Sequence, residues 1–131
     1  MANTIKSLRS PLGRARGLGS AKEGAHHWWA QRLTAIALIP LTIWFAYSLA
    51  SLAGGSYADF TAWLSAPINA TLMILVVSVA FHHAQLGMQV VFEDYVSSHA
   101  LRTGTIIAVK FACAAFAALS IVSILVVAFG R

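Results

Sequence analysis

The side chains best suited to chemistry lie in the stretch FHHAQLGMQVVFEDY, residues 81–95. Two adjacent histidines, His82 and His83, stand inside a long apolar run, and Asp94 and Tyr95 follow about three helical turns later. Ionisable groups are costly in hydrocarbon, so those kept by a membrane helix usually pair with one another or mark a functional site. The stretch therefore indicates either the capping and interface residues of an ordinary membrane helix or a site that holds a ligand.

A helical projection separates the two histidines. At about 100° per residue, His83 shares a face with small residues one turn away on either side, Ala80 and Gly87. His82 belongs instead to a polar stripe of serine and glutamine side chains, which normally faces a partner helix because lipid offers no hydrogen bonds. His83 lies roughly 15 Å from the C-terminal end of its helix, near the midplane of a ~30 Å core. Its imidazole is a candidate axial ligand for a flat macrocycle such as haem, and the alternative is a histidine hydrogen-bonded to a neighbouring helix.

A second candidate site lies at the end of the same helix, where Glu93, Asp94 and Tyr95 follow one another. Because membrane helices run up and down, Arg32 at the start of the preceding apolar segment should lie at the same membrane surface. An acid, a phenol and a guanidinium there could bind a small polar headgroup and deliver protons to it. The alternative is an interfacial ion pair with an aromatic anchor. Two acids oppose the dipole at a helix C-terminus, so we expect compensation from Arg32 or from a partner.

The segment GAHHWWAQR, residues 24–32, adds two more histidines, His26 and His27. They could anchor the helix at the membrane interface, or they could hydrogen-bond an anionic group such as a haem propionate alongside Arg32. The spacing alone favours neither interpretation. The sequence contains no Cys-x-x-Cys pair, glycine-rich phosphate loop or plausible serine triad, and its single cysteine, Cys113, has the setting of a small buried apolar residue.

Membrane helices must position these residues. Of the 131 residues, 59% are hydrophobic and only 10% are charged, whereas a soluble domain carries about 25% charged residues. A bilayer core needs roughly 20 apolar residues of helix, and three charge-free runs meet that length, at 33–53, 67–92 and 111–130. We therefore predict an all-α integral membrane protein with three transmembrane helices, at about 30–53, 67–92 and 105–129, and no room for a separate soluble catalytic domain.

The net charge of +5 does not indicate nucleic-acid binding, because the basic residues gather beside the first span. Most of the Lys and Arg residues precede this span or lie at its start, namely Lys6, Arg9, Arg14, Arg16, Lys22 and Arg32. By the positive-inside rule, the N-terminus and the connection 93–104 are cytoplasmic, and the connection 54–67 and the C-terminus lie outside. We therefore expect residues 1–25 to form a basic cytoplasmic tail and residues 26–131 a transmembrane anchor domain.

The pattern in HAQLGMQVVFEDY, with His83 followed four residues later by Gly87 and twelve residues later by Tyr95, resembles the small membrane-anchor subunit family of bacterial succinate dehydrogenase. AHHWWAQRLTA is similar to that family's entry into its first helix, with a histidine six residues before an arginine. The resemblance implies a helical bundle with a second membrane anchor, the cytochrome b subunit. It also implies that the cytoplasmic face docks an iron–sulfur subunit, which in turn carries a flavoprotein subunit.

The resemblance also implies roles for individual residues. By position, His83 matches the axial ligand to the iron of haem b, whose other ligand comes from the second anchor subunit. Tyr95 matches the tyrosine that hydrogen-bonds a carbonyl of ubiquinone, and Asp94 matches its acidic neighbour. Arg32 and His26 match basic groups near the haem propionates and the quinone pocket.

The two extra histidines, His82 and His27, stand outside the matched positions. The helical projection assigns His82 to packing, in agreement with the register of the resemblance. Which ring of the pair His26 and His27 is used stays open.

The implied function is that of an anchor in the bacterial inner (plasma) membrane, not catalytic alone but contributing to a quinone-reducing site. It passes electrons from the iron–sulfur subunit to quinone in the tricarboxylic acid cycle and respiratory chain. One alternative is the anchor of a related quinone-linked reductase such as fumarate reductase. Another is a small proton-coupled transporter, in which an intramembrane histidine and the pair Glu93 and Asp94 relay protons.

Overall fold

The computed structural model describes residues 10–12 and 22–130. Within these residues the chain forms four helices and no strand: α2 (Lys22–Leu52), α3 (Tyr57–Leu64), α4 (Pro67–Tyr95) and α5 (His99–Phe129). Three of them are long and apolar enough to cross a membrane, over Gly24–Leu52, Pro67–Tyr95 and His99–Phe129. The prediction of an all-α protein with three transmembrane helices is confirmed.

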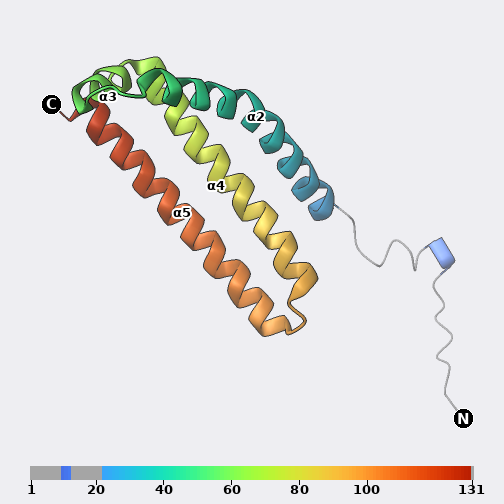
Figure 1. Cartoon of the computed structure of the whole chain (residues 1–131). Helices are drawn as coiled ribbons and strands as arrows, with labels where there is room; N and C mark the ends of the chain where they lie inside the picture. Colours follow the sequence, from blue (N-terminus) through green and yellow to red (C-terminus); the bar gives the residue numbers. More distant parts are fainter. Residues whose placement is uncertain (1–9, 13–21, 131) are drawn as a thin grey trace, which may run out of the picture.

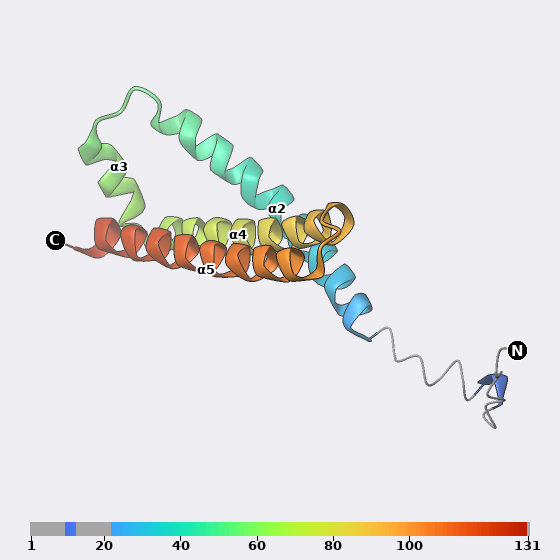
Figure 2. The same cartoon turned by 90° about the horizontal axis from the view of Figure 1, so that it is seen from below.

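The helices α4 and α5 form an antiparallel pair, and α2 bows across α4 (Figure 1). Seen from below, α2 crosses α4 and then diverges from it, and the short helix α3 closes the gap at the far end (Figure 2). Aromatic stacking holds this arrangement. Trp44 of α2 stacks on Trp63 of α3 with ring centroids 5.8 Å apart, and Phe81 of α4 stacks on Phe116 of α5 at 6.4 Å.

The long helices extend beyond the charge-free runs of the sequence. The helix α5 begins at His99 rather than near residue 105, and α2 begins at Lys22, inside the segment expected to be a tail. Helices of 29 to 31 residues are about 45 Å long, roughly 15 Å more than the hydrocarbon core. The charge-free runs correspond to the part of each helix that lies in the hydrocarbon core, whereas the helices themselves continue into the membrane interface. The tail predicted over residues 1–25 lies largely outside the described residues, and so do four of its basic residues, Lys6, Arg9, Arg14 and Arg16.

The connection 54–67, expected only as a link between two spans, contains the helix α3. Its N-terminus carries a capping box in which the Ser56 hydroxyl accepts a hydrogen bond from the Asp59 backbone N–H, and the Asp59 carboxylate accepts one from the Ser56 backbone N–H at 2.7 Å. The hydrogen bonds that the Ser56 backbone N–H and the Ser56 hydroxyl donate to the carboxylate hold the pKa of Asp59 below its ordinary value. Gly54 supplies the turn before the cap with a φ of +82°, which favours glycine.

The buried core is small and lies where α3 meets α4 and α5. Leu64, Ala70, Ile124 and Ala128 form it. Elsewhere large apolar side chains are exposed along all three long helices, among them Ile36, Ile43, Leu75, Val91, Phe111 and Leu119. Contiguous apolar surface on this scale marks a face that lipid or other apolar helices cover.

Candidate functional site

The His83 side chain is half-buried at the place where α4 meets α2. Its Nδ1 atom is 2.9 Å from the Thr34 hydroxyl, and its Nε2 atom is 3.5 Å from the Gln31 side-chain nitrogen. Gln31 and Thr34 are three residues apart, so both lie on one face of α2. Gly87 lies one turn along α4, and a Cβ atom built there would be 3.5 Å from the Gln31 nitrogen. The structure therefore places His83 and Gly87 on one face, as the helical projection predicted, and turns that face toward α2.

A cavity of about 510 Å³ adjoins His83, between α2 and α4, and Trp28, Arg32 and Val90 are among its lining residues. The Arg32 guanidinium lies over the Trp28 ring, with Cζ 4.2 Å from the ring centroid, which fixes a cation in this wall of the cavity. The cavity thus combines an imidazole, a guanidinium and apolar walls.

Two buried polar atoms at this cavity have no hydrogen-bond partner within the described residues, the His27 Nε2 atom and the Gln31 Oε1 atom. A buried polar atom without a partner is costly, and native proteins usually satisfy such atoms with water, an ion or a ligand. The cavity beside His83 therefore contains two polar atoms that no described residue of the chain hydrogen-bonds.

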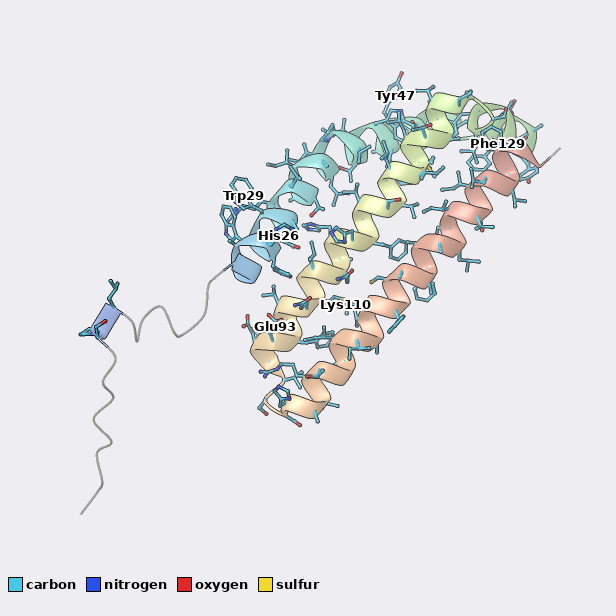
Figure 3. The ribbon with its side chains drawn as sticks, turned by 180° about the vertical axis from the view of Figure 1, so that it is seen from behind. His26, Trp29, Tyr47, Glu93, Lys110 and Phe129 are labelled. Carbon is cyan, nitrogen blue, oxygen red and sulfur yellow. The ribbon has the colours of Figure 1, made fainter. Side chains whose placement is uncertain are left out.

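His26 and His82 do not line this cavity. They line a second one, of about 680 Å³. Figure 3 labels His26 on α2 and Lys110 on α5, with α4 between these two helices, and both residues line this cavity. Adjacent helical residues point about 100° apart, so His82 and His83 line different cavities, whereas His27 lies between the two and lines both. The structure groups His27, rather than His26, with Arg32 and His83. The role predicted for His26 near a propionate is not tested by this placement and stays a prediction.

Asp94 and Tyr95 lie at the end of α4, and both are exposed, Tyr95 by 84%. In the part of the chain that the structure describes, neither side chain has a hydrogen-bond or salt-bridge partner. The neighbouring Glu93 carboxylate accepts a hydrogen bond from the Gln89 side chain at 2.8 Å. The Arg32 guanidinium lies over the Trp28 ring, and within the described residues no ion pair joins it to the acids at this helix end.

The donor set limits what the site can hold. Within residues 10–12 and 22–130 no group of three or more His, Cys, Asp or Glu side chains converges as a metal site. A single imidazole is nevertheless enough for one axial position of a haem iron, since the macrocycle supplies the equatorial ligands. Sequence reasoning missed Thr34 and Gln31, although two polar residues at helical spacing beside an apolar run were a usable signal.

Known proteins are similar to this chain over most of its length. The family model described as succinate dehydrogenase/fumarate reductase transmembrane subunit matches residues 6–126. A protein of Rickettsia bellii is 42% identical over 126 residues, which cover 95% of this chain and 96% of that protein. A protein of Rickettsia conorii is 36% identical over 83% of this chain and 87% of its own length, and one of Paracoccus denitrificans is 34% identical over 83% and 84%. All three are named succinate dehydrogenase hydrophobic membrane anchor subunit.

Proposed function

The chain belongs to the succinate dehydrogenase/fumarate reductase transmembrane subunit family, and on that basis we propose that it anchors a succinate:quinone oxidoreductase in the bacterial inner membrane. Membership of the family confirms the resemblance to a succinate dehydrogenase membrane anchor. The proposed complex contains a second membrane anchor, an iron–sulfur subunit and a flavoprotein subunit. Oxidation of succinate to fumarate releases two electrons and two protons, and reduction of ubiquinone to ubiquinol consumes two of each.

The single observation that best supports the proposal is the setting of His83. Its ring is half-buried near the middle of a membrane helix, one nitrogen is hydrogen-bonded to Thr34, and the ring lines a cavity that also contains Arg32. These residues fit a haem b: His83 would bind the iron, and Arg32 would pair with a propionate. The haem, when bound, supplies a one-electron redox centre within the membrane. In the proposed complex, the other anchor subunit would help to hold the haem.

Asp94 and Tyr95 form the proposed quinone site at the cytoplasmic end of α4. Both side chains are exposed and unpartnered within the described residues, so they are free to contact a ligand or another subunit. The Tyr95 phenol would donate a hydrogen bond to a quinone carbonyl, and the Asp94 side chain would orient the phenol and relay protons taken up from the cytoplasm as the quinone is reduced. Arg32 lines the cavity beside His83 together with Val90 and contributes positive charge there.

The proposed orientation follows the basic residues. Lys6, Arg9, Arg14, Arg16 and Lys22 precede the first span, so the N-terminus faces the cytoplasm together with the connection between α4 and α5. This orientation places Asp94 and Tyr95 on the side where the iron–sulfur subunit docks. The connection that contains α3 then faces the opposite compartment.

Co-purification tests this function directly. A tagged copy of the chain, extracted from its own membrane in a mild detergent, should bring with it a flavoprotein, an iron–sulfur protein and a second small membrane protein. The preparation should reduce ubiquinone with succinate and show a b-type haem spectrum. A chain that purifies without flavin or iron and catalyses proton flux in vesicles would contradict the proposal and identify a transporter instead. Comparing succinate oxidation with fumarate reduction by quinol separates the two activities named for the family.

A further inference from the structure

We propose that Thr34 sets the tautomer and the orientation of the His83 ring, so that Nε2, rather than Nδ1, carries the free lone pair. The inference rests on the proposed function in taking that lone pair to be the ligand of a haem iron. Thr34 is a positioning residue in this scheme, because it acts through His83 and contacts no iron itself.

The hydroxyl proton of Thr34 can be accounted for. The Thr34 oxygen is 2.8 Å from the carbonyl oxygen of Ala30, 3.0 Å from that of Gln31 and 2.9 Å from His83 Nδ1. The hydroxyl has one proton, and two of its three neighbours are carbonyl oxygens that can only accept, so in the proposed arrangement it donates to the backbone of α2. Its lone pair is then free to accept, and the donor that faces it is His83 Nδ1–H. A neutral imidazole has one N–H, so Nε2 is left unprotonated.

The Gln31 side chain agrees with the same tautomer. Its amide nitrogen, which can only donate, lies 3.5 Å from His83 Nε2, and an N–H at Nε2 would face it donor to donor. At this distance the contact is at the limit of a hydrogen bond. The Gln31 Oε1 atom has no partner within the described residues. Gln31 can therefore move away from Nε2 with little loss when a ligand approaches.

The position of Thr34 also explains why its hydroxyl is held in place. A threonine side chain in a helix has few rotamers, and the bond to the carbonyl four residues earlier selects one of them. The acceptor is thus fixed relative to α2. A hydrogen bond of this type on the second ring nitrogen of a metal-binding histidine fixes the ring and raises its basicity as a ligand.

The test uses three variants at Thr34 and one at His83. Thr34→Val keeps the shape of the side chain but removes the hydroxyl, Thr34→Ala removes both, and Thr34→Ser keeps the hydroxyl. Loss of such a hydrogen bond typically lowers metal affinity by roughly 10–100-fold, so the haem-to-flavin ratio of the purified complex should fall in the valine and alanine variants and recover in the serine variant. His83→Leu should lose the haem altogether.

The second readout does not depend on haem or on activity. In the full chain, labelled with ¹⁵N-histidine and reconstituted without haem in lipid bilayers, the ring ¹⁵N shifts of His83 report its tautomer. The wild type and Thr34→Ser should hold the proton on Nδ1, and Thr34→Val and Thr34→Ala should show a mixture. A proton on Nε2 in the wild type, or unchanged shifts in both hydroxyl-free variants, would overturn the proposal. Normal haem content in His83→Leu would instead refute the haem assignment and leave the tautomer measurement as an independent test of Thr34.

Discussion

Replacement of His83 by leucine should remove haem binding without preventing folding, because the structure indicates that the substitution lowers the stability of the fold only slightly. His83 makes one hydrogen bond of ordinary length, to Thr34, and one contact at the distance limit, to Gln31. The Thr34 hydroxyl keeps its bond to the α2 backbone when the imidazole is removed. The loss is then about one hydrogen bond, or roughly 0.5–1.5 kcal/mol. Leucine also suits the half-buried apolar surroundings, so the complex should still assemble.

The effect on haem should be much larger than the effect on stability. Even changes beyond the direct ligands lower metal affinity by 10–100-fold, so loss of the ligand itself should lower the haem-to-flavin ratio by roughly tenfold or more. The assay is the reduced-minus-oxidised spectrum of the purified complex, normalised to covalently or tightly bound flavin. Succinate oxidation with a soluble dye as electron acceptor should be retained, because it does not require the membrane subunits.

His82→Leu is the matched control. It removes the same type of side chain from the next position of α4, but from the cavity that contains His26 and Lys110. Its haem content should stay near that of the wild type. A normal haem spectrum in His83→Leu, or an equal loss of haem in the two variants, would contradict the assignment. That assignment selects His83 rather than His82 as the haem ligand from the helical face on which it lies.

Three further predictions concern other parts of the chain. Tyr95→Phe should lower quinone reduction by roughly 10²-fold, the low end of general acid catalysis, while dye-linked succinate oxidation persists; equal effects on both activities would contradict a quinone role. Gly87→Ala should be tolerated, since the added Cβ would be 3.5 Å from the Gln31 nitrogen, but Gly87→Leu should overpack the α2–α4 contact and cost about 1–3 kcal/mol, measured by thermal unfolding in detergent. The pKa of Asp59 is lowered in the folded state, so the bonds between its carboxylate and Ser56 stabilise the start of α3 at all pH values above the ordinary pKa of 3.8. This stabilisation is lost as the pH falls through the lowered pKa of the folded state. Hydrogen exchange of the α3 amides should therefore differ between wild type and Asp59→Asn at pH 7 and converge as the pH is lowered below 3.8, and a constant difference would show that the carboxylate charge is not responsible.

The number of spans could be read from the sequence because a bilayer of fixed thickness demands a minimum apolar length, and the runs at 33–53, 67–92 and 111–130 meet it. The helix ends could not be read in this way, since polar residues remain helical in the interface. The helix α3 was missed although its cap was visible: Ser56 followed three residues later by Asp59 is a capping-box spacing.

The sequence by itself determined that His83 and His82 face different ways, because the period of an α-helix is fixed and local. Only the tertiary structure decided what His83 faces. Its neighbours Gln31 and Thr34 are about 50 residues away in the chain, and they reach it because α2 crosses α4 at that level. The same crossing brings His27, and not His26, into the cavity beside Arg32. The rotation and crossing point of α2 depend on packing between distant side chains, which no local periodicity encodes.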